Sequence, residues 1–333
     1  MKALVYLGPR RMELQDVAEA QIGAEDALVR VRASAICGSD LHGFREASPR
    51  RIPPLVMGHE AAGVVEAVGA NADPSLVGTR VVAMPVVPCG SCARCREGRP
   101  NLCPDRQLMG MHFPGAFAEA FVLPAGQLLP IPDGLEDAEA SLAEPLANGI
   151  HTASRSVSAG DSVLVIGAGA IGLFAALAAV LAGASRVMVS DRLPGRLALV
   201  TGLGGEPVEA EEAANAVAER TSGEGVDVVI DAVGLPSTWA LALEAVRYGG
   251  HVEAIGLGTP QGPLDYHVLV SKGVTLVGAY ACVPADFERS LALLAAGTID
   301  VAPWITTIPL ADGQRAFESL VDEDRYNKVV LTP

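Results

Sequence analysis

Four cysteines lie within fifteen residues of one another: Cys89, Cys92, Cys95 and Cys103. They are surrounded by glycine, arginine and proline rather than by the periodic apolar residues of a core. Thiolates with this spacing can converge on one tetrahedral ion, and a closed set of four sulfurs suits structural zinc. An iron–sulfur cluster and unligated thiols are the alternative interpretations. A closed site leaves no open coordination position, so the cluster predicts a role in folding rather than in catalysis.

A second chemical motif is a glycine-rich turn that follows an apolar strand at residues 163–166 and precedes a helical run at 173–182. The turn consists of Gly167, Gly169, Gly172 and the intervening Ala170 and Ile171. In a Gly-x-Gly-x-x-Gly motif the first glycine permits the tight turn, the second lets the backbone approach a pyrophosphate, and the third lets helix pack on strand. The helix N-terminus offers free N–H groups and a positive dipole end to phosphates. The motif therefore predicts a dinucleotide site.

An acidic residue bears on which nucleotide would bind. Asp191 ends the next apolar strand, nineteen residues beyond Gly172, where its carboxylate can accept hydrogen bonds from both hydroxyls of the adenosine ribose. The same carboxylate would repel a 2′-phosphate, which favours NAD over NADP. Arg192 and Arg196 follow closely and could tolerate that phosphate, so use of NADP stays open.

The elements that must position these motifs belong to two kinds of domain. Short strands separated by glycine and proline predict a β-rich, barrel-like domain over the first ~150 residues; they cover residues 27–31, 62–68 and 80–83. From Asp161, apolar strands alternate with helices, which predicts a doubly wound parallel sheet buried on both faces. Its expected strands are residues 163–166, 187–189, 226–230, 252–255 and 274–277. Helices at 285–296 and 311–321 and a closing strand at 328–331 complete the predicted α/β fold.

Length and composition exclude several classes of function. A chain of 333 residues suits two domains, because single hydrophobic cores stop growing at about 250–300 residues. The formal net charge of −15 would repel nucleic acids and anionic membranes. The N-terminus lacks a signal peptide's extended apolar region, and the longest apolar stretch, residues 171–184, is shorter than the ~20 residues of a membrane span. We expect a cytoplasmic enzyme with no nucleic-acid or membrane partner.

Three further motifs contain groups that can bind a metal or move a proton. They are Cys37-Gly38-Ser39-Asp40-Leu41-His42, Gly58-His59-Glu60-Ala61-Ala62-Gly63 and Ser141-Leu142-Ala143-Glu144-Pro145. Taken one at a time, such residues are more often a small buried hydrophobe, a satisfied polar residue or a surface charge. Together, and in this order with the four cysteines and the glycine turn, they resemble the zinc-containing medium-chain alcohol dehydrogenases. The pattern Gly58-His59-Glu60-x2-Gly63-x5-Gly69 looks like that family's signature, and the resemblance runs to Lys328.

The resemblance implies a division of the chain into two domains. A GroES-like catalytic zinc domain would comprise residues 1–150 and 284–333, and a Rossmann domain residues 151–283. The cleft between them would hold nicotinamide and zinc. Val233, Gly256, Leu257 and Lys328 are the further candidate cofactor contacts, the first three because they end central strands at the carboxyl edge of the sheet. Family members are dimers or tetramers, so we expect a homo-oligomer.

The resemblance also implies a second, open zinc site with two zinc ions per chain in all. The third ligand is cysteine in classical alcohol dehydrogenases and glutamate in polyol dehydrogenases, so the candidates here are Cys37, His59 and Glu144. Glu60 would either coordinate or exchange with water or substrate. An open position lets zinc act as a Lewis acid on an alcohol. Ser39 would take the hydroxyl proton, and His42 would pass it towards solvent.

The implied reaction is hydride transfer between an alcohol or polyol and NAD. Sorbitol-type enzymes are the nearest branch, but where they carry an Arg-Tyr pair this chain reads Gly278-Ala279-Tyr280-Ala281-Cys282. Loss of that arginine removes a fixed donor fork for polyol hydroxyls, which argues against sorbitol itself. Arg45, Arg50 and Arg51 lie between the first two candidate zinc ligands and could face a phosphorylated or carboxylated polyol, but a solvated surface cluster is the preferred interpretation. The alternatives are an NADP-dependent carbonyl reductase of the same fold and a catalytically silent dinucleotide-binding or structural protein.

Overall fold

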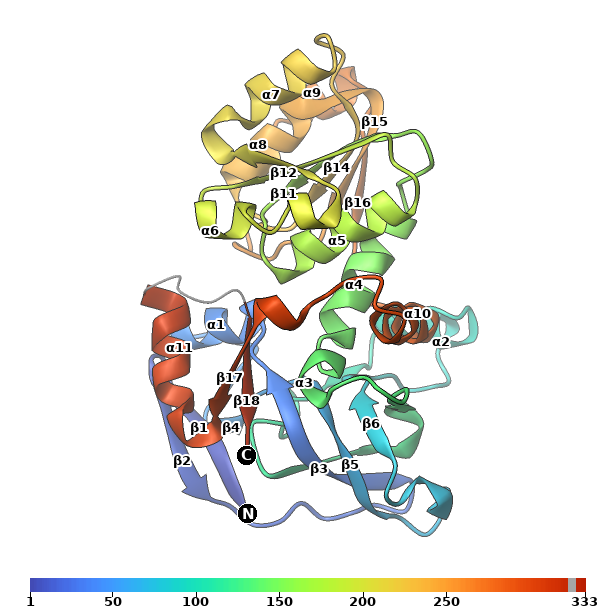
Figure 1. The fold of residues 1–333 in the computed structure, drawn as a ribbon, viewed down its shortest axis with the longest axis vertical. Coiled ribbons are helices and arrows are strands. Elements are labelled where there is room, and N and C mark those ends of the chain that lie inside the picture. Colours follow the sequence, from blue (N-terminus) through green and yellow to red (C-terminus); the bar gives the residue numbers. More distant parts are fainter. Residues whose placement is uncertain (323–327) are drawn as a thin grey trace. The chain divides into compact units, whose positions relative to one another are not determined.

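The computed structural model describes residues 1–322 and 328–333 and divides into two compact units (Figure 1). Met1–Glu144 and Val283–Pro333 form the first unit, and Pro145–Cys282 form the second. Helix α4 (Ala143–Ser154) begins in the first unit and continues into the second. The domain limit expected after residue 150 falls inside this helix.

The first unit is built mainly from antiparallel strands, and only β17 and β18 among its described strands pair in parallel. Its small sheet has the order β2-β1-β4, with bounds Arg11–Asp16, Lys2–Gly8 and Leu55–Val56. Its large sheet has the order β10-β6-β5-β3-β18-β17, with bounds Leu128–Pro130, Arg80–Ala83, Glu60–Val68, Asp26–Ala35, Lys328–Thr332 and Ile305–Pro309. Strand β9 (Ala120–Pro124) also pairs with β3. These strands form the β-rich domain that the sequence predicts.

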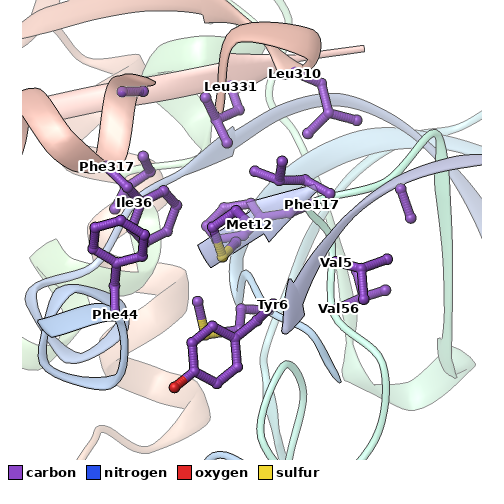
Figure 2. Packing of buried hydrophobic residues seen from close by; sticks show 14 of the residues in the cluster. Val5, Tyr6, Met12, Ile36, Phe44, Val56, Phe117, Leu310, Phe317 and Leu331 are labelled. Atoms are coloured by element: carbon purple, nitrogen blue, oxygen red, sulfur yellow. The ribbon is translucent and has the colours of Figure 1, made fainter. Parts of the chain in front are cut away.

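The C-terminal segment belongs to this unit because it completes the core. Strand β18 pairs antiparallel with β3 and parallel with β17. Helix α11 (Gly313–Asp322) inserts Phe317 between Phe44 and Phe117, with ring centroids 5.1 and 5.8 Å away (Figure 2). Aromatic contacts at these separations add to the burial of apolar area. The remaining helices of the unit are α1 (Gly38–Arg45), α2 (Ala93–Arg96), α3 (Asp137–Ala140) and α10 (Pro284–Ala295).

The second unit is a doubly wound parallel sheet, as predicted. Its order is β13-β12-β11-β14-β15-β16, with bounds Glu206–Glu209, Arg186–Asp191, Ser162–Ile166, Val226–Asp231, Val246–Ala254 and Thr275–Gly278. The helices are α5 (Ala170–Leu181), α6 (Pro194–Leu197), α7 (Ala213–Arg220), α8 (Pro236–Ala245) and α9 (Tyr266–Ser271). The sequence did not predict β13, because this edge strand has a single buried residue, Val208. No helix in the described part of the chain has the length and apolarity to cross a bilayer.

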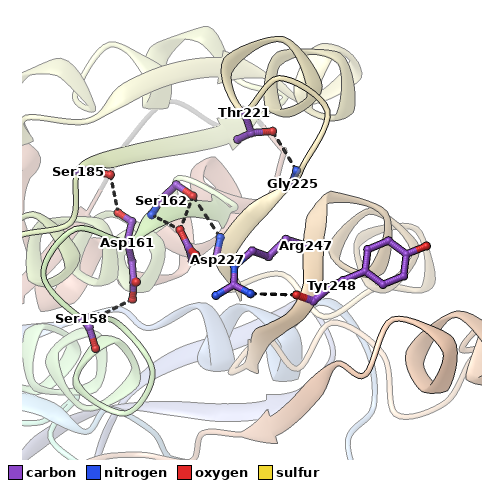
Figure 3. A network of polar contacts seen from close by, with 9 residues as sticks. All are labelled: Ser158, Asp161, Ser162, Ser185, Thr221, Gly225, Asp227, Arg247 and Tyr248. Atoms are coloured by element: carbon purple, nitrogen blue, oxygen red, sulfur yellow. Dashed lines mark hydrogen bonds and ion pairs between the residues drawn. The ribbon is translucent and has the colours of Figure 1, made fainter.

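A carboxylate ties together the amino ends of three strands in this unit (Figure 3). Asp227 Oδ2 accepts hydrogen bonds from Ser162 N and Oγ at 2.8 and 2.7 Å, and Oδ1 accepts one from Arg247 Nε at 2.6 Å. Burial raises the pKa of Asp227, but the bonds from Ser162 and the Arg247 charge outweigh it, so the pKa is lowered. The ionised carboxylate therefore stabilises the starts of β11, β14 and β15.

Replacing Asp227 with asparagine removes this charge and keeps the shape of the side chain. We expect Asp227→Asn to lower the free energy of unfolding by about 1–2 kcal/mol at neutral pH. Because the folded-state pKa is depressed, the stabilisation is present above the unfolded value of ~3.9 and is lost as the pH falls through the folded value. Urea unfolding of both proteins from neutral to acid pH measures the difference.

Asp16→Asn is the matched control, since Asp16 pairs with Lys2 on the surface with both side chains at least half exposed. Its effect should be smaller than that of Asp227→Asn, because exposed ion pairs are screened by solvent. An Asp227→Asn loss that did not shrink on acidification would contradict the assigned role.

Candidate zinc and nucleotide sites

The four clustered cysteines converge on one point in the first unit. Their Sγ atoms all lie within 4.8 Å of one another. Cys92 caps α2, and Cys103 follows a tight turn at residues 100–102. Gly90 and Gly98 turn the chain with φ of 72° and 73°, a region that side chains disfavour. The loop is thus shaped so that its sulfurs, rather than apolar side chains, fill its centre.

The electrostatics of this cluster fit a cation. Backbone N–H groups of Ser91 and Cys92 lower the pKa of Cys89 to about 6, whereas burial and the neighbouring Cys92 raise the pKa of Cys95 to about 12. Adjacent thiolates repel one another, so all four ionise together only around a positive ion. Four sulfur donors are the set that tetrahedral structural zinc takes. The residues present therefore fit the predicted metal.

A second cluster is buried at the end of strand β3. Ligand atoms of Cys37, His59 and Glu60 lie within 4.8 Å of one another. Cys37 is the N-cap of α1, and Glu60 begins β5. Since Ala35 faces Glu60 in the antiparallel register of β3 and β5, the two strands bring the three side chains together. His59 is 5% exposed and Glu60 is fully buried.

The charges around His59 also favour a cation. Burial lowers the pKa of His59, but Asp40, Cys37 and Glu144 outweigh it and raise the pKa to about 10. Glu60 Oε1 is buried with no hydrogen-bond partner among the described residues, and such a polar atom is costly unless an ion or water satisfies it. Sulfur, nitrogen and oxygen donors together suit zinc. This donor set fits a zinc ion.

Glu144, the predicted third ligand, lies near the same cluster. Glu144 is buried at the first turn of α4, and its charge raises the pKa of both His59 and Lys328. Its carboxylate nevertheless lies outside the set that converges within 4.8 Å, where Glu60 is found instead. Glu60 directly follows His59 in the chain, whereas Glu144 lies on helix α4. Glu60 therefore converges with Cys37 and His59, and ligation by Glu144 stays a prediction.

Lys328 lies beside the Cys37 cluster. Lys328 is buried in the first unit, where its Nζ lies 2.5 Å from Glu60 Oε2 and donates to Ile36 O at 3.0 Å. Burial lowers the pKa of Lys328, but Glu60, Cys37 and Glu144 raise it overall. The ammonium group is therefore buried and paired with Glu60 rather than facing solvent, and its contact with a pyrophosphate stays a prediction.

Helix α1 carries the two expected proton-transfer residues. Ser39 Oγ accepts a hydrogen bond from Arg51 Nη2 at 3.0 Å. His42 lies at the surface, and partial desolvation and then the charge of Arg45 lower its pKa. The imidazole is therefore mostly uncharged at neutral pH and can accept a proton.

Two residues of this region were not assigned from the sequence. Asp40 is fully buried and accepts from Arg51 Nη2 at 2.9 Å, and Arg51 is buried rather than part of a solvated cluster with Arg45 and Arg50. The position of Asp40, three residues after the helix cap, is a capping signal that could have identified it. Arg51 has no local signal that separates it from the neighbouring arginines.

The glycine turn lies at the carboxyl edge of the second unit's sheet. Gly167 has φ of 97°, and a Cβ on Gly172 would lie 1.7 Å from Gly167 O, so helix α5 approaches the turn too closely for a side chain. A Cβ on Gly169 would meet nothing within 4 Å. The backbone of the turn is therefore open where α5 begins with Ala170 and Ile171.

Asp191 lies beside the glycine turn. Its Oδ2 accepts from Ala168 N at 2.7 Å and its Oδ1 from Leu193 N at 3.0 Å. Arg196 Nη1 lies 3.8 Å from Asp191 Oδ2, whereas Arg192 is exposed. Each carboxylate oxygen has a second lone pair, so Asp191 can still accept from a ribose.

The other expected cofactor contacts gather on the same edge. Val233 Cγ2 lies 2.6 Å from where a Cβ of Gly167 would be, and a Cβ on Gly256 would lie 2.3 Å from the Val233 carbonyl carbon. Asp231 holds this loop, with Oδ1 accepting from Val233 N and Gly234 N at 2.9 and 3.0 Å. Leu257 is largely exposed. Residues at or just after the ends of the strands β12, β14 and β15 therefore lie around the glycine turn.

Metal binding at the four-cysteine cluster can be tested with Cys92→Ser. We expect this variant to bind one zinc fewer per chain than the parent and to lose more than about 2 kcal/mol of stability, because binding of structural zinc contributes directly to folding. Metal analysis and thermal unfolding measure both, and limited proteolysis should cut residues 88–104 first. Cys282→Ser, outside both clusters, is the control and should match the parent. Unchanged zinc content in Cys92→Ser would refute the site.

Comparison with known proteins agrees with this geometry. The model of the alcohol dehydrogenase GroES-like domain matches residues 23–133, and that of the zinc-binding dehydrogenase matches residues 170–296. L-threonine 3-dehydrogenase of Alteromonas mediterranea is 34% identical over 339 aligned residues, covering 99% of each chain. Two solved structures align with 100% of this chain, and the alignment includes 99% of each of those chains. They are alcohol dehydrogenase TADH from Thermus sp. ATN1 (35% identity, TM-score 0.91) and a zinc-binding dehydrogenase of Sinorhizobium meliloti 1021 bound to NADP (29%, 0.90). The chain therefore belongs to the zinc-containing medium-chain alcohol dehydrogenase family and combines a GroES-like domain with a Rossmann-type sheet.

Proposed function

We propose that this protein is a zinc-dependent dehydrogenase that transfers a hydride from a small secondary alcohol to NAD, with one catalytic and one structural zinc per chain. The observation that carries the proposal is the buried convergence of Cys37, His59 and Glu60 within 4.8 Å. The substrate classes are polyols and hydroxy amino acids. The name of the Alteromonas relative, L-threonine 3-dehydrogenase, supports the second class.

The residues around the cluster have separate tasks. Bound zinc would supply Lewis acidity towards the alcohol oxygen, and bound NAD would supply the hydride acceptor. Cys37, His59 and Glu60 would hold the metal, with Glu144 available as a further carboxylate. Lys328 holds one oxygen of Glu60 and leaves Oε1 directed elsewhere. The chain thus provides ligands whose orientation is fixed before substrate binds.

Proton removal from the alcohol falls to helix α1. Ser39 Oγ uses one lone pair for Arg51, so its second lone pair can accept the substrate proton while its own hydrogen passes onward. His42, uncharged at neutral pH because its pKa is lowered, is the acceptor that releases the proton to solvent.

We also propose a homo-oligomer, a dimer or a tetramer. Strand β16 is the last strand of its sheet, and among the described strands it pairs only with β15. Exposed apolar side chains accompany this edge: Leu276, Val270, Tyr266 and Leu264. An open edge with apolar neighbours is a site for pairing with another chain. A second copy could cover it.

NAD is the proposed cofactor because the negative charge of Asp191 would face a 2′-phosphate. We expect Asp191→Asn to raise the ratio of kcat/KM with NADP to that with NAD by about 10–100-fold, since a like-charge contact costs several kcal/mol. Initial rates with both cofactors measure this ratio. Glu209→Gln is the control, because Glu209 pairs with Asp191 in the parallel register but is exposed. An unchanged ratio in Asp191→Asn would contradict the assignment.

The proposed reaction is tested by NADH formation with linear polyols, sugar phosphates, 2,3-diols, simple alcohols and hydroxy amino acids including L-threonine. We expect activity on one class that a zinc chelator abolishes. His59→Gln should lower kcat/KM by about 100-fold or more, because it removes a ligand. His267→Gln, an exposed histidine on α9, should keep the parental rate. No NADH from any class, with zinc and NAD bound, would sink the proposal.

A further inference from the structure

We propose that Arg51 is a positioning residue of the zinc site, one that orients the proton relay and the histidine ligand through a single nitrogen. The proposal rests on the proposed function of Cys37, His59 and Ser39. Arg51 Nη2 donates to Ser39 Oγ at 3.0 Å and to Asp40 Oδ1 at 2.9 Å. The side chains of Arg51 and Asp40 are 4% and 0% exposed.

Arg51 restricts how Ser39 can hydrogen-bond. A guanidinium group is always charged and only donates, so it must occupy a lone pair of the Ser39 hydroxyl. The hydroxyl hydrogen then has to point away from Arg51, and one lone pair remains for a substrate hydroxyl. A serine without this contact would rotate among three staggered positions. Arg51 thus selects the orientation in which Ser39 can accept one proton and pass on another.

Arg51 also acts on His59 through Asp40. Asp40 Oδ1, which Arg51 holds, lies 3.6 Å from His59 Nδ1, while Oδ2 accepts from Cys37 N at 3.2 Å. The carboxylate therefore hydrogen-bonds to the backbone of Cys37 and lies within ion-pair distance of His59, whose Nδ1 has no hydrogen-bond partner among the described residues. Partners behind a ligating histidine fix its ring orientation and typically change metal affinity or activity by about 10–100-fold. Without Arg51, the fully buried Asp40 carboxylate would lose the cationic side chain that hydrogen-bonds to it.

The fold makes room for this arginine. A Cβ on Gly43 would lie 2.5 Å from Arg51 Cδ, so the stem of Arg51 passes over helix α1 only where a side chain is missing. Tyr6 OH donates to Gly43 O at 2.8 Å and fixes the same turn of the helix. Burial raises the pKa of Tyr6 and the Arg51 charge opposes that rise, which is consistent with their proximity. The position of Arg51 is thus set by a packed site rather than by solvent.

Two variants perturb this contact in different ways. Arg51→Gln removes the charge and the fork, whereas Gly43→Ala removes no polar group and displaces the Arg51 stem. Alanine also favours the helix more than glycine does, so helix α1 should not weaken. We expect both variants to hold zinc at the Cys37 cluster about tenfold less tightly in chelator competition, and kcat to fall about 10–100-fold with little change in KM. Arg50→Gln, its exposed neighbour on the same loop, should match the parent.

A double-mutant cycle tests the link to Ser39. If Arg51 acts through Ser39, the kcat of the Ser39→Ala/Arg51→Gln protein should exceed the value obtained by multiplying the two single effects. If Arg51 were merely structural, the two single effects on kcat would multiply, and zinc would be lost to the chelator as readily as from the parent. Multiplicative effects or an unchanged zinc affinity would each overturn the proposal.

The chelator arm needs no turnover, so it separates this proposal from the proposed function. Parent protein that oxidises no alcohol but releases zinc more slowly than Arg51→Gln would sink the function and support the role of Arg51. If Arg51→Gln does not fold, Gly43→Ala decides by the same two readouts.

Discussion

The charged groups buried around His59 must be paired for the first unit to be stable. Cys37, Asp40, Glu60 and Glu144 place anionic or ionisable groups near one buried imidazole. Buried charges are costly unless they are paired and hydrogen-bonded. Two buried cations meet this need in the described chain, with Arg51 on Asp40 and Lys328 on Glu60. The site is therefore built as a balance of charges, to which a metal ion adds.

This balance explains why the chain returns to its first unit after the Rossmann-type sheet. Lys328 begins β18, whose register places Val330 opposite Ala35, and Ile36 N donates to Val329 O at 2.9 Å. A slip of one residue would turn Lys328 to the other face of the sheet and leave Glu60 without its cation. The aromatic packing of Phe317 holds the same segment in place. The C-terminal strand thus contributes to the electrostatics of the site as well as to the core.

How far the sequence predicted each site depended on the distance along the chain between its parts. The four cysteines and the glycine turn are contiguous, so spacing alone indicated their chemistry, and alternating apolar segments gave the doubly wound sheet. The sequence did not predict that Arg51 and Lys328 are buried, because their partners Asp40 and Ile36 lie 11 and 292 residues away. The Gly-His-Glu motif indicated both His59 and Glu60, but the register of β3 and β5 that brings them to Cys37 is not encoded in any motif. Strand β13 has too few apolar residues to indicate a strand.

In the nucleotide turn, the residue expected to set cofactor preference also supports the backbone of the turn. Asp191 is the residue expected to distinguish NAD from NADP, yet its two oxygens already accept from Ala168 N and Leu193 N. Ala168 lies between the first two glycines of the turn, so the carboxylate that would read the ribose also holds the backbone that would meet the pyrophosphate. Hydrogen bonds to a charged acceptor contribute about 1.5–3 kcal/mol each. Selection for cofactor preference at this position therefore acts on the shape of the turn as well, which ties specificity to the local fold.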